Sequence, residues 1–289
     1  MKTLEPDAEL IKDALLNNYY KSRRTNKMFF NDNKISLLTT PKQGVKTLEV
    51  FKSSYYLSYV TNDMSTKNIE DNTVKGKNRY RWQAINKFPY ILDPAKKINR
   101  IKPLETSNFS NHIGGNTIAF SDNEMILWQQ SQSAQRSEDL IAPTGSGSLD
   151  IADYENNPHK LFPMLREGME RELSEEGTEK NAPIFNLAEK TKIVGFYRWV
   201  GKGGLPGFLG VSKIKGNIAL KPNSSEVKLF IPETDEIDMK VNTINELIEL
   251  IDFLFTNEMD NLSVPLYANL KALKQAAIED PRFLDFIFS

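Results

Sequence analysis

Three glutamates in the segment RELSEEG (171–177) have the spacing expected of metal ligands. Glu172, Glu175 and Glu176 stand at positions i, i+3 and i+4, so a helix would gather their carboxylates on one side. Like charges at this spacing repel by about 0.2–0.5 kcal/mol per pair, and Arg171 offsets part of that repulsion. Hard divalent cations bind carboxylate and backbone carbonyl oxygens. The segment therefore predicts either a solvated, charged helix face or an oxygen-ligand metal site.

The segment 161–176 is predicted to form the helix that carries these side chains. Pro163 falls in the first turn, where a missing N–H costs little, and Gly177 falls where a left-handed C-cap is needed. Apolar residues recur every four positions and predict the buried face: Leu161, Leu165, Met169 and Leu173. The segment LIAPTGSGSLD (140–150) is predicted as a strand that runs into a glycine- and serine-rich bend, TGSGSLD (144–150), and this bend could bring backbone oxygens near the carboxylates.

The composition restricts the kinds of site that the chain can hold. The 289 residues include no cysteine, which excludes disulfides, thiol catalysis and cysteine-bound zinc. His112 and His159 are the only histidines, so any bound metal must be held mainly by oxygen, which favours magnesium, manganese or calcium.

Charge and hydropathy bear on partners and location. The formal net charge of −1 gives no overall field that would attract nucleic acid or an anionic membrane. The first twenty residues are charged and lack the apolar core of a signal peptide, and no stretch approaches the length of a membrane span. The expectation is a cytoplasmic protein with no membrane or nucleic-acid partner.

Periodicity predicts the order of elements along the chain. Helices are expected at 8–22, 161–176, 242–256 and 264–279. Strands are expected at 35–40, 45–60, 190–200, 207–216 and 226–232, with two more inside 116–131 and a polar loop at 61–80. Strands followed by a helix, further strands and two helices favour an α+β fold or an α/β sandwich. We expect an N-terminal α+β extension or subdomain over 1–109 and a second domain over 110–289.

The segment RELSEEG resembles the core of the Nudix box, whose family pattern is G-x5-E-x7-R-E-U-x-E-E-x-G-U with U a bulky apolar residue. Five residues match R, E, U, E and E in order: Arg171, Glu172, Leu173, Glu175 and Glu176. The upstream half departs from the pattern, because Pro163 replaces the family glutamate and Asn157 replaces the glycine before it. The late glycine falls one place early, at Gly177. The resemblance covers roughly residues 110–235.

This resemblance implies an α/β/α sandwich with a mixed sheet and a Mg²⁺- or Mn²⁺-dependent hydrolase. Its reaction would be cleavage of the pyrophosphate bond of a nucleoside diphosphate joined to another group. By the same resemblance, Glu172, Glu175 and Glu176 would be metal ligands, with a glycine carbonyl from Gly147 or Gly145. Glu175 and Glu176 would act in catalysis, and Arg171 would orient the cluster by ion pairing.

The remaining roles have several candidates. Arg136 and Arg198 are candidate phosphate contacts, and three aromatic residues are candidates to stack on a base: Trp128, Tyr197 and Trp199. The general base could be a box glutamate or one of three later carboxylates: Glu226, Glu233 and Glu236. GKGGLPG (201–207) fits a phosphate loop or a hairpin turn.

Two other functions stay open at this point. One is a Nudix-like module that binds a nucleotide or nucleotide sugar without cleaving it, and the other is an interaction protein whose charged helix is only solvated. The N-terminal hundred residues could mediate homodimerisation or cap the substrate pocket.

Overall fold

In the computed structural model the chain forms two compact units, which are described separately. The first comprises Met1–Ile113, Asp150–Ala152 and Arg198–Pro206, and the second comprises Gly114–Leu149, Asp153–Tyr197 and Gly207–Ser289. The structure describes residues 8–25, 31–42, 44–70, 80–82, 88–95, 97–131, 139–179, 183, 186–216, 218, 220–224, 227–232 and 237–288.

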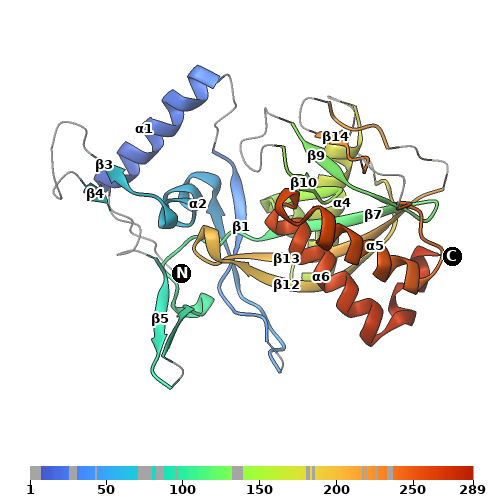
Figure 1. Cartoon of the computed structure of the whole chain (residues 1–289). Coiled ribbons are helices and arrows are strands. Elements are labelled where there is room, and N and C mark those ends of the chain that lie inside the picture. Colours follow the sequence, from blue (N-terminus) through green and yellow to red (C-terminus); the bar gives the residue numbers. More distant parts are fainter. Residues whose placement is uncertain are drawn as a thin grey trace. The chain divides into compact units, whose positions relative to one another are not determined.

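The second unit is built on a mixed five-stranded sheet (Figure 1). Its order is β11 (Gly145–Ser148), β7 (Gly114–Ser121), β13 (Leu205–Ile214) and β12 (Ala188–Trp199), and β8 (Glu124–Ile126) also pairs with β7. β13 runs parallel to β7, whereas β11 and β8 run antiparallel to it. The segment 144–150, expected as a bend, is thus largely an edge strand, because Gly145–Ser148 pair in register with β7.

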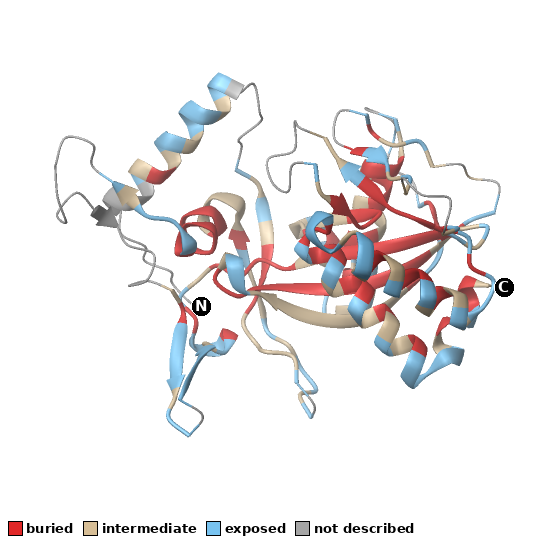
Figure 2. Cartoon of the chain, viewed as in Figure 1, coloured by how far each residue is buried: buried red, intermediate tan, exposed pale blue. Residues whose placement is uncertain are grey.

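Helices cover both faces of this sheet. Successive side chains of a strand point to opposite faces, and β7 shows this alternation. Ile118 and Phe120 pack in one apolar cluster with α5 (Ile244–Asn257) and α6 (Val264–Glu279), whereas Ala119 packs with Leu173 of α4 (Leu161–Gly177) in another. The central strands between these layers are almost wholly buried (Figure 2). The expected α/β/α sandwich with a mixed sheet is confirmed.

Smaller elements complete the second unit. A three-stranded sheet has the order β10 (Ile141–Ala142), β9 (Trp128–Gln130) and β14 (Val227–Leu229). Trp128 is buried there, and its indole N–H donates to the Thr144 carbonyl at 2.6 Å. The 3₁₀ segment Pro281–Ile287 adds Leu284 and Ile287 to the core beneath α5 and α6.

The last two helices begin at residues that cap them. The Thr243 hydroxyl accepts the N–H of Glu246 at the start of α5, and Ser263 accepts the N–H of Leu266 at the start of α6. The Glu246 carboxylate in turn accepts the Asn242 N–H at 2.8 Å. The Thr243 and Ser263 hydroxyls thus accept N–H donors that the first turn of a helix leaves without partners.

We expect Thr243→Ala to lower the free energy of unfolding by about 1 kcal/mol, because the Glu246 N–H loses its acceptor. Urea denaturation of the full chain measures this, with Glu249→Ala at an exposed position of the same helix as the matched control. Equal losses in the two variants would contradict a capping role for Thr243.

The first unit combines short sheets with helices. Its elements are α1 (Ala8–Thr25), β1 (Asn33–Leu37), β2 (Val50–Ser54), α2 (Tyr55–Thr61), β3 (Ile69–Glu70), β4 (Tyr80–Trp82), β5 (Tyr90–Asp93) and β6 (Ile98–Ile101), and a 3₁₀ turn at Asp63–Thr66. The strands form three antiparallel pairs, β1 with β2, β3 with β4 and β5 with β6. The loop expected at 61–80 is therefore only partly irregular, and residues 71–79 lie outside the described part.

The strand expected over 45–60 is present only as Val50–Ser54, and its second half is wrong. Ser54 ends β2 and caps α2 instead, because its hydroxyl accepts the N–H of Leu57. Tyr59 and Val60 are buried on the resulting helix, packed with Ala14 of α1. The seven residues of α2 make about two turns of helix. The Ser54 cap and the packing against α1 stabilise this helix in place of a longer strand.

Buried amides tie the first unit together. The side chains of Asn62 and Asn111 are buried, and Asn62 Nδ2 donates to Asn111 Oδ1 at 3.1 Å and to the Lys202 carbonyl at 3.2 Å. The Asn111 backbone N–H donates to Asn62 Oδ1 at 2.9 Å. Lys202 lies in the turn between β12 and β13, so this network holds that turn in the first unit. Within the described residues, no helix has the length and apolar character needed to cross a membrane.

Candidate functional site

The helix expected over 161–176 is present as α4, Leu161–Gly177. Leu165, Met169 and Leu173 are fully buried on the face toward the sheet, and Leu161 at the first position is only partly buried. This packing fixes the rotation of α4 about its axis. It therefore also fixes the direction in which the charged positions between these residues point.

The end of α4 differs from the expectation. Gly177 is the last helical residue and is not in the left-handed conformation, and Thr178 is the extended C-cap. The last carbonyls of the helix accept hydrogen bonds from a segment more than forty residues later in the chain. Glu176 O accepts the Asn223 N–H and Gly177 O accepts the Lys221 N–H, both at 2.9 Å. A Cβ at position 177 would lie 3.2 Å from Leu220, so the glycine leaves room for this capping segment.

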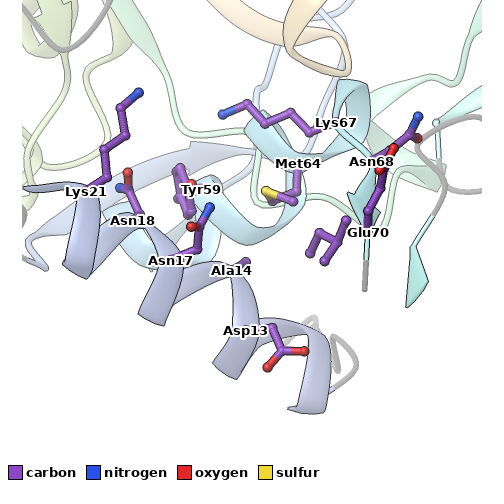
Figure 3. A pocket seen from close by; sticks show the side chains of 11 residues that line it. Asp13, Ala14, Asn17, Asn18, Lys21, Tyr59, Met64, Lys67, Asn68 and Glu70 are labelled. Carbon is purple, nitrogen blue, oxygen red and sulfur yellow. The ribbon is translucent and has the colours of Figure 1, made fainter. Parts of the chain in front are cut away.

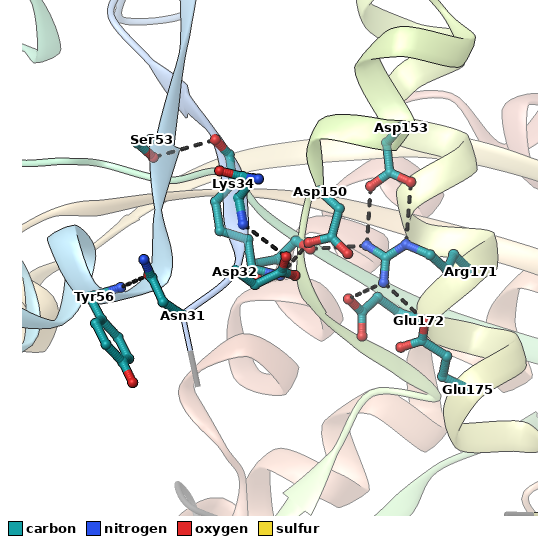
Figure 4. A network of polar contacts seen from close by, with 12 residues as sticks. Asn31, Asp32, Lys34, Ser53, Tyr56, Asp150, Asp153, Arg171, Glu172 and Glu175 are labelled. Carbon is teal, nitrogen blue, oxygen red and sulfur yellow. Dashed lines mark hydrogen bonds and ion pairs between the residues drawn. The ribbon is translucent and has the colours of Figure 1, made fainter. Parts of the chain in front are cut away.

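Arg171 is the centre of the charged cluster (Figure 4). Its Nη1 donates to Glu172 at 2.9 Å and to Glu175 at 3.2 Å. Its Nε and Nη2 donate to the two carboxylate oxygens of Asp153 at 3.2 and 3.1 Å, and Nη2 also donates to the Ser148 carbonyl at 3.0 Å. A guanidinium has five N–H donors, and each has an acceptor here. Arg171 is therefore locked in one orientation.

Asp153 is the contact that the sequence did not reveal. It lies on the short helix α3 (Ile151–Asn156), and only 2% of its side chain is exposed. The absence of a side chain at Gly168 leaves space for it, since a Cβ there would lie 3.1 Å from the Asp153 carboxylate. Nothing local distinguishes this aspartate from exposed Glu155 two residues later, so only the folded chain identifies it.

The segment between β11 and α4 contains a short helix. The residues that separate the glycine-rich strand from the helix contain α3, which carries Asp153 to Arg171. The acidic partner that Arg171 gains in this way comes from α3, whereas Pro163, eight positions before Arg171, offers no carboxylate.

Two glycines bring β11 against α4 at two different points. A Cβ at Gly145 would lie 2.7 Å from the backbone nitrogen of Leu173, so the strand and helix backbones touch there. A Cβ at Gly147 would lie 2.1 Å from the carboxyl carbon of Glu172. The Glu172 carboxylate thus occupies the space that any side chain at position 147 would need. Backbone of the glycine strand and carboxylate of the helix are in direct contact.

The four glutamates of 170–176 do not all belong to this cluster. Glu170 hydrogen-bonds Thr191 of β12, and burial raises the pKa of its carboxyl group. Glu172 is mostly buried, Glu175 is 40% exposed, and Glu176 is buried. Arg171 reaches Glu175 but not Glu167, which accepts hydrogen bonds from Asn156 and Asn157.

The proposed ligands do not form a ready-made metal cage. Among the described residues, no three acidic or histidine side chains converge as a metal-binding group. In this arrangement Glu172 and Glu175 both face the Arg171 guanidinium. The donor chemistry still suits a hard cation, because carboxylate oxygens of α4 lie directly against the backbone of Gly147.

The candidate substrate residues have structural contacts. Arg198 belongs to the first unit, where its guanidinium donates to the carbonyls of Gly204 and Lys102, and burial lowers its pKa to about 10. The first four residues of GKGGLPG lie in the turn between β12 and β13, with Gly203 and Gly204 at positive φ, and the last three begin β13. These contacts indicate a structural use for Arg198 and leave its phosphate contact a prediction.

The three aromatic residues predicted to stack on a base also have structural contacts. Trp128 is core, as its burial and hydrogen bond show. Tyr197 covers Gly207, where a Cβ would lie 2.3 Å from the ring, and burial raises the pKa of its hydroxyl group. Trp199 stacks beneath the Lys202 ammonium, 3.9 Å from the ring centroid. Arg136 and the three candidate bases Glu226, Glu233 and Glu236 lie outside the described residues.

Comparisons with known proteins give similarity in fold only. No protein-family model matches the sequence, and no curated protein is significantly similar to it. The chain is similar in fold to a NUDIX hydrolase from Alicyclobacillus acidocaldarius, at 13% identity and a TM-score of 0.37, covering 57% of this chain and 92% of that one.

A second similar structure is a bifunctional NMN adenylyltransferase/ADP ribose pyrophosphatase from Francisella tularensis. The identity is 17%, the TM-score is 0.29, and the match covers 51% of this chain and 41% of that one, so it spans less than half of that protein. Both TM-scores lie below 0.5. Support for a function therefore has to come from the residues of α4, α3 and β11.

Proposed function

We propose that the second unit is a Nudix-type, metal-dependent hydrolase that cleaves the pyrophosphate bond of a nucleoside diphosphate joined to another group. One observation carries the proposal: the Glu172 carboxylate fills the space where position 147 would have a side chain. This contact places an acidic residue of the box helix directly against glycine backbone, although the upstream half of the sequence motif is altered.

The residues that would hold the cation are Glu172, Glu175 and Glu176, with the Gly147 carbonyl. All four offer oxygen, and this is the ligand type that Mg²⁺ and Mn²⁺ accept. A divalent cation bound here would neutralise charge on a diphosphate and lower the pKa of a bound water. Glu175, at 40% exposure, is the carboxylate most open to solvent and hence to a ligand.

The chain's own contribution is orientation and charge balance. Arg171 holds Glu172 and Glu175 from one nitrogen, and Asp153 fixes the opposite edge of the same guanidinium. The positive charge between the carboxylates reduces their mutual repulsion while the cation is absent. Charge-assisted hydrogen bonds of this kind are both stronger and more directional than neutral ones.

A hydrolase accounts for this cluster better than a module that only binds nucleotide. A nucleotide phosphate is an anion, and three carboxylates on one helix face would repel it. The acidic cluster becomes useful to an anionic substrate only when a cation lies between them. The Asp153–Arg171 pair supports the proposal as well, because it gives the arginine an acidic partner although the upstream half of the motif is altered.

The test is turnover of a panel of nucleoside diphosphate sugars, dinucleoside polyphosphates and nucleoside triphosphates by the full chain with Mg²⁺, with Mn²⁺ or with EDTA. We expect metal-dependent release of a nucleoside monophosphate or pyrophosphate. Glu175→Gln should lower the rate by at least about a hundredfold with an unchanged melting temperature in EDTA. The matched control is Glu179→Gln, at an exposed glutamate that pairs with Lys221.

Turnover that persists in EDTA, or that Glu175→Gln leaves intact, would overturn the proposal. If no compound is cleaved but a nucleotide raises the melting temperature equally in wild type and Glu175→Gln, the second unit is a binding module.

A further inference from the structure

The first unit contains a cavity of about 620 Å³ that the proposed hydrolysis does not use (Figure 3). It lies among α1, α2, the 3₁₀ turn Asp63–Thr66 and β3. Ligand pockets for small molecules typically measure about 300–1,000 Å³, so the cavity has room for one of them.

The floor of the cavity is apolar. Ala14 of α1, Tyr59 of α2 and Met64 of the 3₁₀ turn are each less than a tenth exposed and belong to one apolar cluster. Ile69 of β3 packs against the same cluster and also lines the cavity. Such a floor suits a weakly polar group, because contact with it removes apolar surface from water.

The rim of the cavity is polar and carries charge of both signs. Lys21 of α1 and Lys67 beyond the 3₁₀ turn extend their amino groups along one side, while Asp13 lies on the opposite side (Figure 3). The Lys67 ammonium lies 5.3 Å from the centre of the Tyr59 ring, so it is placed above the floor. An anionic group of a ligand would be attracted to the lysine side.

Amide side chains complete the rim. Asn17 and Asn18 come from α1 and Asn68 from the segment before β3. An amide offers both a donor and an acceptor, which is the combination that pairs with the edge of a nucleobase. The carboxylates of Asp13 and Glu70 can accept hydrogen bonds from hydroxyl groups.

We propose that this cavity binds a nucleoside monophosphate, with the base on the floor of Ala14, Tyr59 and Met64 and the phosphate near Lys21 and Lys67. A free phosphate or sulfate uses only the lysine side and leaves the apolar floor empty. A purely apolar ligand would contact the floor only and would make no polar contact with the rim. A base, a sugar and a phosphate use each part of the lining. Every residue of the site belongs to the first unit, so the inference does not depend on the proposed hydrolysis.

The test measures binding of AMP, GMP, CMP and UMP to the full chain by isothermal titration calorimetry in EDTA, which removes any metal-dependent binding at α4. Adenosine and inorganic phosphate serve as partial ligands. We expect at least one monophosphate to bind at least about tenfold more tightly than either partial ligand, because charge-assisted contacts to phosphate add to contacts on the floor.

Two variants locate the binding. Lys21→Glu/Lys67→Glu should weaken the affinity by at least about tenfold. Asn17→Trp changes an exposed position on the rim, so it should block the cavity and weaken binding without altering the core. This variant locates the binding site if the charge variant fails to fold. The matched control is Lys12→Glu, an exposed lysine of the same helix that does not line the cavity.

Three results of the nucleotide titrations would overturn the proposal: no monophosphate binds at millimolar concentration, binding is unchanged in both cavity variants, or phosphate alone binds as tightly as the nucleotide.

A single-stranded RNA oligonucleotide tests one other occupant. If it binds much more tightly than any monophosphate, and this binding depends on Arg23 and Arg24 and not on Asn17, this end of α1 is a nucleic-acid surface and the proposal is wrong. Loss of hydrolysis in the Glu175→Gln variant bears on none of these outcomes.

Discussion

Asp153→Asn is expected to lower the free energy of unfolding by about 2–4 kcal/mol, because it removes one partner of a largely buried ion pair. Asp153 accepts two hydrogen bonds from Arg171, and the arginine side chain is itself only 16% exposed. An asparagine keeps the size of the side chain but presents an amide group with no charge to the guanidinium. The positive charge of Arg171 then lacks its most buried counter-charge.

The same substitution should weaken the site itself. Arg171 would lose at least one of its five hydrogen bonds, so the donor between Glu172 and Glu175 would be held less rigidly. Loss of a residue that orients ligands costs about 10–100-fold in metal affinity or activity. Titration with Mn²⁺, followed by calorimetry, measures the affinity separately from turnover. A variant that loses stability but binds Mn²⁺ as wild type does would show that Asp153 is only structural.

Glu155→Gln is the matched control, since Glu155 is exposed on the same short helix. It should leave both the stability and the metal affinity unchanged. A double variant with Arg171→Met separates the pair from its surroundings: if Asp153 acts through Arg171, the two losses should be far from additive. Additive losses would contradict a direct coupling between them.

Gly145→Ala and Gly147→Ala are expected to damage the protein in two different ways, although the two glycines stand on the same face of β11. At Gly145 the new methyl group would lie 2.7 Å from the nitrogen and 2.9 Å from the Cα of Leu173. Backbone cannot move aside without shifting α4, so we expect a loss of about 2–3 kcal/mol in the free energy of unfolding. Metal affinity, measured in the fraction that folds, should change much less.

At Gly147 the new methyl group would meet the Glu172 carboxylate, which is the end of a flexible side chain. The carboxylate can swing away at little cost in stability, about 1 kcal/mol or less. It then no longer lies against the backbone of β11, and we expect Mn²⁺ affinity and turnover to fall about 10–100-fold. Urea denaturation and Mn²⁺ titration of both variants check the contrast. The reverse order of effects would refute the assignment of Gly147 to the site and Gly145 to packing.

Local patterns explain the elements that could be predicted. The apolar spacing of Leu165, Met169 and Leu173 indicates α4, and it also indicates that Glu172 and Glu175 leave the helix on a different face. The apolar residues that alternate within 116–131 indicate strands, and the order of strands and helices along the chain favours an α+β fold or a sandwich. These periodicities are properties of neighbouring residues, and burial against any apolar partner satisfies them. The sandwich follows because each apolar face needs cover.

Only the tertiary structure decided the partners within the site. Asp153 reaches Arg171 because it lies on α3, the short helix between β11 and α4. The sequence around Asp153 does not distinguish it from Glu155, which is exposed. Gly147 contacts Glu172 where β11 packs against α4. At Gly177 the lack of a side chain leaves room for Leu220, and it does not serve a left-handed turn. Each of these depends on the distance between segments far apart in the chain. The sequence by itself therefore determined the charged helix and the layers around it, whereas the packing of those layers decided which of its charges are held together.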